Sequence, residues 1–528
     1  MKVIKTILLS LAALTAVGVQ AQIDFDPSKK LATAEYVIRS LYADSLNMEK
    51  VVEQGIIGML KELDPHSLYT NAEETKALTE PLNGNFSGIG VQFQMVQDTV
   101  YVIQTVASGP SEKVGIIPGD RIIAANDTVI AGRKLANSQI MKQLRGPKGS
   151  WVNLKVVRRS EPDTLIFRVK RDDIPLYTVD ASYMAAPGVG YIRISSFGQT
   201  TTEEFKKAMA QLKSEGMKDL IIDLQDNGGG YMQPAIDIAQ TFLSPGEMIV
   251  YTEGLRQPAQ YFHSKGGGKR MDGRVVVMLN EFSASASEIL AGALQDNDRA
   301  AVVGRRSFGK GLVQRPIPFP DGSMIRLTTA HYYTPSGRSI QKPYNKGNDD
   351  SYKNDLKDRY DHGEIFSADS MRIDSTKVYR TRLGRPVYGG GGIIPDRFVP
   401  ADTTGINKYF RNVRAKNAIN QYVVDYVEKH RKELNRRYPN EKSFIEKFAV
   451  TPEMMADFTA LATELGAEGS DEQRAEAAPL LQANIKGLIG RDLFTPATYF
   501  QILNPIPPTY REALRLVLDP KDYDSIFN

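Results

Sequence analysis

The sequence predicts an α/β (α+β) protein built from several domains. Between about 178 and 342, apolar strand-like runs such as "DLIIDLQ" and "RVVVML" alternate with helical stretches, which is the pattern of a layered α/β core. Residues 84–172 instead contain short β-patterned runs separated by Gly, Pro and Asp turns. The flanking regions place apolar residues at three- and four-residue intervals and are expected to be helical. A chain of 528 residues is also too long for one ordinary core.

These patterns divide the chain into five parts. We expect a leader at 1–21, an N-terminal helical region at 22–83, a β-rich domain at 84–172, an α/β core at 173–404 and a C-terminal helical domain at 405–528. Within the core, residues 345–385 are polar, charged and rich in tyrosine without a clear period, so they are expected to form an exposed insertion.

Composition excludes several classes of function. The formal net charge of +4 is small for this length and gives no indication of a nucleic-acid partner. The absence of cysteine rules out disulfides, a thiolate nucleophile and cysteine-bound zinc. The five histidines are scattered and none lies in an HExxH arrangement, which argues against a metal-dependent hydrolase.

The N-terminus has the features of a secretory signal peptide. Lys2 and Lys5 precede an apolar stretch that ends in the small-residue site Val19-Gln20-Ala21, so the mature chain is expected to start at Gln22. The alternative is an uncleaved anchor, but the apolar run is shorter than the ~20 residues that a membrane span needs. We therefore predict an exported protein of the periplasm or cell envelope of a bacterium, with at most peripheral membrane contact.

The region at 84–172 resembles a PDZ domain throughout its length. The resemblance rests on "FSGIGVQF", "SGPSEKVGIIPGDRIIAANDTVI" and "LRGPKGSWVNLKVVR", taken in this order. In that family a glycine turn presents backbone N–H groups to the C-terminal carboxylate of a peptide, which then pairs as an added strand. The corresponding turn is Gly88-Ile89-Gly90-Val91, and Arg145 could assist as a bidentate donor. A plain turn and a solvated arginine are the alternative interpretations.

The stretch "GRRSFGKG" (304–311) is one residue short of a phosphate-binding loop. Gly311 stands where that loop carries a magnesium-binding hydroxyl. Pro316 and Pro318 follow at once and prevent the helix that such a loop opens. A nucleotide-dependent enzyme therefore remains only a weak alternative, and Lys310 needs another explanation.

A serine-rich turn lies 25 residues before Lys310. In "NEFSASASEILAGAL" a buried strand turns into a helix at Ser285, whose neighbours are small. The sequence Ser285-x-x-Glu288 also fits a capping box, so on its own this serine is expected simply to cap the helix. A lysine held neutral could nevertheless act as its base. A glycine run in "DNGGGY" (226–231) opens another helix and exposes free N–H groups.

These stretches together resemble the C-terminal processing (tail-specific) serine peptidases. The resemblance covers roughly residues 25–400 and includes "NEFSASASEILAGALQDNDRAAVVGRRSFGKGLVQ", "DLQDNGGG" and "YYTPSGRSIQ". It implies a crotonase-like (ClpP/crotonase-type) protease core with an inserted PDZ domain, and it needs no metal or organic cofactor. The implied site comprises Ser285 as nucleophile, Lys310 as general base, Gln314 as the residue that orients the lysine, and the N–H groups of Gly229 and Ala286 as the oxyanion hole. The family turn usually reads Asn-Pro-Gly-Gly, whereas Gly228 takes the proline position here.

The resulting expectation is an exported serine endopeptidase that recognises protein C-terminal tails and cleaves through an acyl-enzyme. This chemistry requires the pKa of Lys310 to fall from about 10.4 to about 7–8. The alternative is a catalytically inactive PDZ scaffold that only binds protein C-termini. The helical tail shows amphipathic stretches that need an apolar partner surface, either in its own core or in a homodimer. The residues concerned are Tyr422, Val423, Tyr426, Val427 and Leu434.

Overall fold

The computed structural model describes residues 26–106, 108–159, 161–266 and 270–528. The predicted signal peptide at 1–21 lies outside these residues. The chain divides into two units, Met1–Leu63 and Asp64–Asn528. Across the described residues, no helix is both long and apolar enough to cross a membrane.

The first unit contains two described helices, α2 (Pro27–Leu41) and α3 (Met48–Lys61). The side chain of Asp26 caps the N-terminus of α2, and that of Asn47 caps α3. In these two helices only Leu60 is buried, so most of their apolar side chains face solvent.

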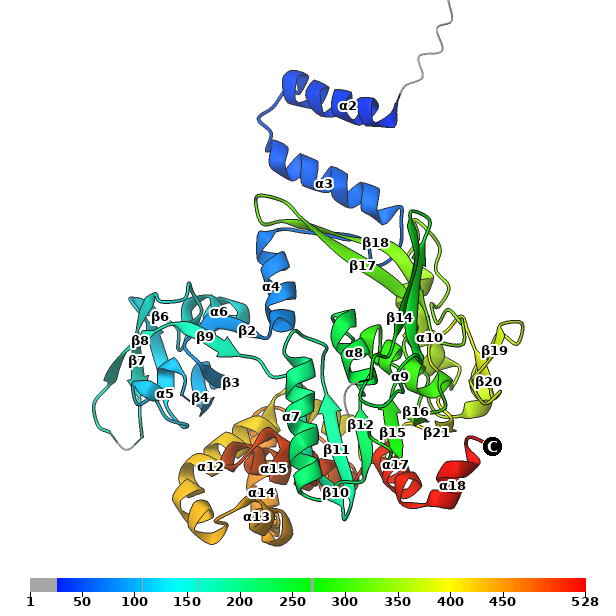
Figure 1. Ribbon diagram of the computed structural model, residues 1–528. Coiled ribbons are helices and arrows are strands. Elements are labelled where there is room, and N and C mark those ends of the chain that lie inside the picture. The colour runs from blue at the N-terminus through cyan, green and yellow to red at the C-terminus, as the bar shows by residue number, and fades with distance from the viewer. Residues whose placement is uncertain (1–25, 107, 160, 267–269) are drawn as a thin grey trace, which may run out of the picture. The chain divides into compact units, whose positions relative to one another are not determined.

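The centre of the second unit is a six-stranded sheet with the order β10-β11-β12-β15-β16-β21 (Figure 1). Strands β11 to β21 are parallel, whereas the edge strand β10 runs antiparallel to β11. The strands are β10 (Val179–Ala186), β11 (Val189–Ile194), β12 (Asp219–Asp223), β15 (Val275–Leu279), β16 (Ala301–Gly304) and β21 (Arg397–Phe398). The inner strands β12, β15 and β16 are buried along their whole length, as parallel strands covered on both faces require.

Helices cover both faces of this sheet. One face carries α7 (Thr201–Ser214), α8 (Met232–Ala239) and α9 (Ala286–Asp296), which form the largest apolar cluster together with alternate strand residues. The opposite face packs against α17 (Pro508–Leu518) and the neighbouring α18 (Pro520–Ser525). The sequence analysis assigned these last two helices to a separate helical domain, but the structure makes them part of the core because their apolar stripe covers Ile221, Val276 and Val303.

A second, antiparallel sheet contains the strand that follows Lys310 in the chain. Its order is β1-β18-β13-β14, and β17 also pairs with β18. The strands are β1 (Leu68–Thr70), β13 (Met248–Gly254), β14 (Gln257–His263), β17 (Leu312–Pro318) and β18 (Met324–Tyr333). Since β17 begins at Leu312, two residues after Lys310, and no helix starts there, the loop at 304–311 does not have the strand–loop–helix context of a phosphate loop.

The region predicted to be PDZ-like forms a β domain of its own, which α4 (Ala72–Asn83) precedes in the chain. Its main sheet has the order β3-β4-β5-β7-β8 with β6 beside β5, and β2 pairs with β9. The strands are β2 (Asn85–Gly88), β3 (Val91–Val96), β4 (Thr99–Thr105), β5 (Arg121–Ala125), β6 (Thr128–Val129), β7 (Trp151–Val157), β8 (Leu165–Lys170) and β9 (Asp172–Pro175). Helices α5 (Pro110–Lys113) and α6 (Asn137–Leu144) complete the domain. Strand β3 is an edge strand, which leaves one side free for an added strand.

The predicted exposed insertion at 345–385 is only partly exposed. It contains α10 (Asp350–Asp361), the short helix η1 (Ala368–Ser370) and strand β19 (Val378–Arg380), which pairs with β20 (Pro386–Tyr388). Tyr352 and Arg359 are buried, as is Glu364 just after α10. The polar composition misled the prediction because these charges are buried as pairs: Glu364 accepts hydrogen bonds from Arg359 (2.9 Å) and Arg306 (2.6 Å).

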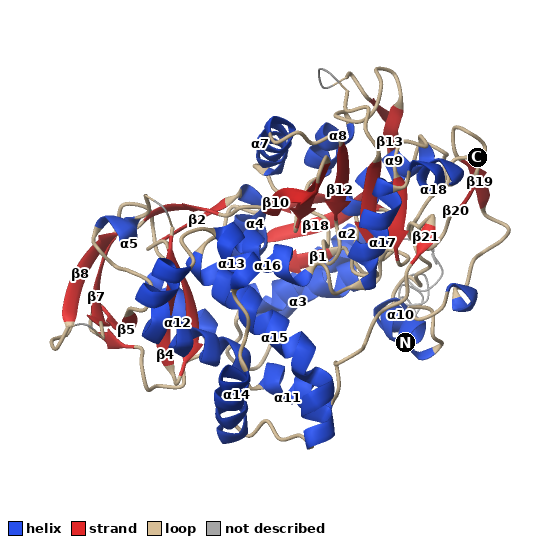
Figure 2. Cartoon of the chain, turned by 90° about the horizontal axis from the view of Figure 1, so that it is seen from below, coloured by secondary structure: helices blue, strands red, loops and turns tan. Residues whose placement is uncertain are grey.

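The C-terminal helices pack around their own apolar core (Figure 2). They are α11 (Lys408–Ala415), α12 (Ala418–Arg437), α13 (Glu441–Lys447), α14 (Pro452–Glu464), α15 (Asp471–Leu493) and α16 (Pro496–Leu503). Of the residues that suggested a partner surface, Tyr422, Val423, Val427 and Leu434 are buried in this core, and Tyr426 packs against it. Their apolar partner therefore lies within the chain.

Candidate active site

Ser285 lies on a strained turn between β15 and α9. Its backbone has φ 57° and ψ −113°, a conformation that a non-glycine residue rarely adopts. The two neighbouring serines are buried and engaged: Ser283 Oγ donates to Leu224 O (2.8 Å) and Ser287 Oγ donates to Asn227 O (2.9 Å). Ser285 is the partly exposed serine of the three, so the turn presents its hydroxyl.

The glycine run approaches this turn closely. A Cβ on Gly229 would lie 2.7 Å from Ser285 Cβ and 3.0 Å from the nitrogen of Ala286, and Gly229 has φ 98°. Only glycine fits here. By contrast, a Cβ on Gly228 would meet nothing within 4 Å, so the departure from the family turn at this position has no steric consequence.

The two predicted oxyanion donors differ in their present partners. The N–H of Ala286, in the first turn of α9, has no hydrogen-bond partner among the described residues. The N–H of Gly229 donates to Asn227 Oδ1 at 2.8 Å. The structure therefore brings both groups to Ser285 but leaves only one of them free.

Ser285 and Lys310 are held by the same two side chains. Glu288 Oε2 accepts the N–H of Ser285 (2.8 Å) and the N–H of Lys310 (2.9 Å). The Tyr332 hydroxyl lies within hydrogen-bond distance of Ser285 O (3.1 Å) and of Lys310 O. The serine and the lysine, 25 positions apart in the chain, are thus fixed side by side through their backbones.

Glu288 is the residue whose role the sequence analysis missed. It was interpreted as part of a capping box, and its carboxylate does accept the Ser285 N–H. The carboxylate is fully buried, and it also accepts hydrogen bonds from Ser307 Oγ (2.5 Å) and Gly309 N (2.7 Å). Burial raises its pKa to about 7, although these hydrogen bonds act in the opposite direction. An acidic residue three positions after the serine was the available sequence signal.

The environment of Lys310 favours its neutral form. Burial is the main cause, and the charge of Arg326 is the second; together they lower the pKa of Lys310 to about 8. The carboxylates of Glu288 and Asp64 act against this shift. Within the described residues, Lys310 Nζ makes no hydrogen bond, so its lone pair is not committed elsewhere when the amine is neutral.

Gln314 lies on β17 but does not bond to Lys310. Its amide donates to Leu312 O (3.3 Å) and Thr328 Oγ1 (3.4 Å). Thr328 Oγ1 in turn donates to Asp64 Oδ1 at 2.9 Å. Gln314 therefore reaches the surroundings of the lysine only through this threonine and this aspartate.

Asp64 and His66 are two further residues near the lysine that the sequence analysis did not use. Burial lowers the pKa of His66 to about 3, and the positive charge of Lys310 contributes. This histidine is therefore neutral, and its Nε2 lies 2.7 Å from the hydroxyl of Tyr352 on α10. Both residues lie in the stretch "GMLKELDPHSLYT" (58–70), which falls within the residues covered by the family resemblance, but no role was assigned to either of them.

The turn Gly88-Ile89-Gly90-Val91 joins β2 to the free edge strand β3. Gly90 has φ 73°, and a Cβ there would approach Ile174 at 3.0 Å, so this glycine is required. Arg145 points elsewhere: it donates to Glu80 on α4 (2.8 Å) and lies over the ring of Phe86. In this structure Arg145 is therefore already paired.

Ser285 lies on a strained strand-to-helix turn, beside glycine N–H groups and a half-buried lysine of lowered pKa. This is the arrangement of a serine peptidase. Comparison with known proteins identifies the family. Residues 188–347 match the model of peptidase family S41, residues 87–169 match the PDZ domain, and residues 409–495 match a family of unknown function.

Relatives of known family also match this chain in sequence. The carboxy-terminal processing protease CtpB of Bacillus subtilis is 36% identical over 366 residues, which cover 68% of this chain and 75% of that protein. The carboxy-terminal-processing protease of Bartonella bacilliformis is 37% identical over 309 residues, covering 58% of this chain and 70% of that protein. A solved photosystem II D1 C-terminal processing protease aligns with 63% of this chain and 90% of its own at 27% identity and a TM-score of 0.35.

The chain therefore belongs to peptidase family S41, as a carboxy-terminal processing serine protease with a PDZ domain. The predicted enzyme class and the PDZ resemblance are thereby confirmed.

Proposed function

We propose that Ser285 is the nucleophile of this protease and Lys310 its general base. The observation that carries this assignment is the shared anchoring of both backbones on Glu288 Oε2 and the Tyr332 hydroxyl. It is supported by the partial exposure of Ser285 and by the lowered pKa of Lys310. A lysine with a pKa near 8 is substantially neutral at weakly alkaline pH and can accept a proton.

The proposed reaction proceeds through an acyl-enzyme. Neutral Lys310 accepts the proton of the Ser285 hydroxyl while the oxygen attacks the scissile carbonyl carbon. The protonated lysine then donates its proton to the leaving amine, and the C–N bond breaks. A water molecule then attacks the ester carbonyl as the same lysine accepts its proton. The lysine returns this proton to Ser285 Oγ as the C–O bond breaks, which releases the carboxylic acid product and regenerates the serine.

The N–H groups of Ala286 and Gly229 are the proposed oxyanion hole. The free Ala286 N–H lies at the N-terminus of α9, where the helix dipole favours developing negative charge. The Gly229 N–H would exchange Asn227 Oδ1 for the oxyanion when substrate binds. Gln314 would influence Lys310 through Thr328 and Asp64, because no direct hydrogen bond joins the two.

We further propose that the PDZ domain selects protein C-terminal tails. The turn at 88–91 would hold the terminal carboxylate, and the preceding residues would pair with the free edge of β3. Arg145 could join the carboxylate only by leaving Glu80. Relatives are named carboxy-terminal processing proteases, which is consistent with such substrates.

The remaining parts of the proposal concern fold type, location and assembly. We expect the core to be of the crotonase-like type, and the protein to be exported to the periplasm or cell envelope with at most peripheral membrane contact. N-terminal sequencing of the mature chain should begin at Gln22. A homodimer through the helical domain would have to use its exposed residues, because Tyr422, Val423 and Val427 are buried.

Labelling with a fluorophosphonate, together with casein digestion, tests the catalytic assignment. The Ser285→Ala variant should lose both label and proteolysis while still binding C-terminal peptides. Ser283→Ala and Ser287→Ala are the matched controls on the same turn and should retain the label. Loss of activity in either control, with activity preserved in Ser285→Ala, would show that the nucleophile is misassigned. A wild-type protein that binds peptides without taking the label would instead be an inactive scaffold.

A further inference from the structure

The C-terminal helical domain, which matches a family of unknown function, borders a groove that is contiguous with the PDZ domain. Three neighbouring cavities of about 440, 940 and 700 Å³ form this groove. The first and second share Asn417, Asn420 and Arg491. The second and third share Val179, Asp180 and Pro496. We call the three together the tail-domain groove.

The groove begins where a bound tail would leave the PDZ domain. Its first cavity is lined by four consecutive residues of β3, Gln92 to Met95, and by Asn137 at the start of α6. The proposed carboxylate turn at 88–91 precedes β3, so an antiparallel added strand would carry its upstream residues along β3 toward this cavity. The helical domain lies at that exit, where Gln94 donates to Asn417 Oδ1 (3.3 Å).

The groove ends at a second free strand edge. Six consecutive residues of β10, from Val179 to Met184, line the third cavity. In the described sheet β10 pairs only with β11. Apart from the Val179 N–H, which donates to Glu204 Oε2 (2.9 Å), the backbone groups on its outer edge have no strand partner. Free edges at both ends of one groove suit an extended polypeptide better than a compact small molecule.

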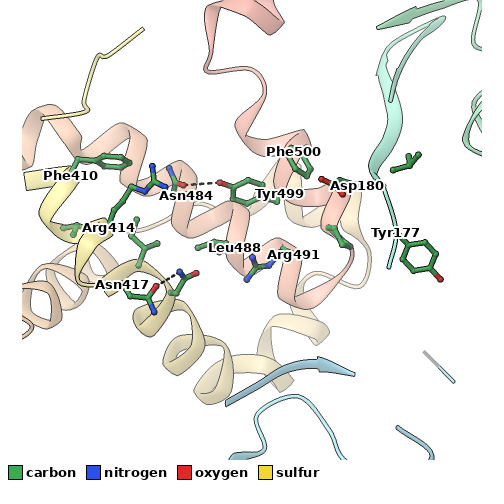
Figure 3. Close-up of a pocket in the computed structure, with 15 residues that line it drawn as sticks. Tyr177, Asp180, Phe410, Arg414, Asn417, Asn484, Leu488, Arg491, Tyr499 and Phe500 are labelled. Atoms are coloured by element: carbon green, nitrogen blue, oxygen red, sulfur yellow. Dashed lines mark hydrogen bonds between the residues drawn. The ribbon is translucent and has the colours of Figure 1, made fainter. Parts of the chain in front are cut away.

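The middle of the groove has a mixed polar and apolar lining and contains the guanidinium group of Arg414 (Figure 3). Asn484, Leu488 and Arg491 follow one face of α15, with Tyr177 and Asp180 of the core on the far side. Arg414 is exposed, and in the described part of the chain its guanidinium forms no hydrogen bond or ion pair. It could therefore pair with an acidic side chain without first breaking a native contact.

Asn417 and Asn420 provide a second, uncharged pair of groups. Asn420 Nδ2 donates to Asn417 Oδ1 at 2.7 Å. Among the described residues this leaves the side-chain NH₂ group of Asn417 and the side-chain oxygen Oδ1 of Asn420 without partners. One donor beside one acceptor matches the two polar groups of a peptide unit.

We propose that the tail-domain groove binds an extended, unstructured segment of the substrate protein that lies upstream of the tail held on β3, with a preference for acidic residues at Arg414. The inference rests on the proposed tail recognition by the PDZ domain and assigns a role in substrate binding to the helical domain. The longer contact would make affinity increase with the length of the unstructured segment.

The test uses the full chain with Ser285→Ala, so that peptides bind without being cleaved. Two fluorescent peptides share one C-terminal sequence: one has six residues, and the other has about 25 with acidic residues upstream, enough to extend over about 80 Å. We expect the long peptide to bind roughly tenfold more tightly. Adding Arg414→Glu should weaken the long peptide about fivefold and leave the short one unchanged. Arg411→Glu, an exposed arginine on the same helix that does not line the groove, is the matched control.

A photo-crosslinker placed upstream in the long peptide locates the contact directly. Cross-links to α11, α15 or β10 support the proposal, whereas cross-links confined to the PDZ domain overturn it. Equal affinity of the two peptides, or equal weakening of both by Arg414→Glu, also overturns it while leaving PDZ recognition intact. If the six-residue peptide does not bind at all, tail recognition by the PDZ domain fails and the groove proposal fails with it.

Discussion

Replacing Glu288 with glutamine tests whether one buried carboxylate keeps the serine and the lysine in place. Each carboxylate oxygen accepts two hydrogen bonds: Oε2 from the N–H groups of Ser285 and Lys310, and Oε1 from Ser307 Oγ and Gly309 N. Glutamine keeps the size of the side chain but replaces one acceptor with an NH₂ donor. The Ser307 hydroxyl can rotate to accept from it, whereas a backbone N–H cannot.

The free-energy cost of the Glu288→Gln substitution depends on which hydrogen-bond donor loses its acceptor. In the better orientation the NH₂ group faces Ser307 and Gly309, and the Gly309 N–H is left unpaired. An unpaired buried N–H costs about 1–3 kcal/mol. The loop that carries Lys310 can shift so that the Gly309 N–H finds another partner, but the lysine then leaves its catalytic position. A loss of about 1–3 kcal/mol in transition-state stabilisation lowers kcat/KM by roughly 5- to 150-fold. The other orientation leaves two N–H groups unpaired and is worse.

Hydrolysis of a quenched fluorescent peptide measures this loss, and circular dichroism establishes that the variant is folded. Glu281→Gln is the control, because Glu281 lies in the same turn, pairs with Arg305 (2.7 Å) and bonds to neither Ser285 nor Lys310. We expect the control to stay within about twofold of wild type, because glutamine at position 281 can still accept the hydrogen bond from Arg305. Wild-type kcat/KM in a folded Glu288→Gln variant would refute the reasoning.

The pH profile separates this role from a purely structural one. Below about pH 8 the neutral fraction of Lys310 falls tenfold per pH unit, because its pKa is lowered to about 8. Below about pH 7 the Glu288 carboxylate also becomes protonated and loses acceptor capacity, because burial raises its pKa to about 7. The logarithm of kcat/KM should therefore fall with slope one and then slope two in wild type, but with slope one throughout in Glu288→Gln.

Three further outcomes follow from the structure. Lys310→Arg should be inactive at every pH from 6 to 10, because guanidinium keeps its proton; any activity that still rises through about pH 8 would exclude lysine as the base. Gly229→Ala should lower kcat about 100-fold or more, because its Cβ would lie 2.7 Å from Ser285 Cβ, and an unchanged kcat would contradict the oxyanion assignment. Glu364→Ala should cost about 3–5 kcal/mol in stability, because Arg359 stays buried without its carboxylate; an unchanged melting temperature in calorimetry would show that this pair is not needed.

Local patterns drew attention to Ser285 and Lys310, and the family resemblance supplied the roles that we propose for them. Ser285 could be located because a buried strand, a run of small residues and a helix follow one another within a few positions. Attention fell on Lys310 because it lies between two glycines and because Pro316 and Pro318 exclude the helix that a phosphate loop needs. Each of these signals is contained within one short segment, so the tertiary structure was not needed to find it.

Side-chain partners could not be predicted in the same way. Gln314 bonds to Thr328 and Arg145 bonds to Glu80, and both choices depend on which segments the fold brings together. The role of Glu288 was ambiguous because the same three-residue spacing fits a capping box and also brings the carboxylate to the backbone N–H of Ser285. The charged segment containing Arg359 and Glu364 indicated exposure, since composition does not reveal that opposite charges are buried together.

The strand that leads to Ser285 depends on contacts that no local pattern indicates. At the start of β15, the backbone N–H of Val275 donates to the Tyr523 hydroxyl (3.1 Å) and its C=O accepts from the same hydroxyl (3.0 Å), across 248 positions of sequence. Along β15 the side chains alternate between the face covered by α9 and the face covered by α17, with Val276 and Met278 on the latter. A hydrophobic strand covered on only one face would expose the other to water. The position of Ser285, the proposed nucleophile, is therefore stabilised through β15 by α17 and α18, while Glu288 and Tyr332 hold its backbone next to that of Lys310.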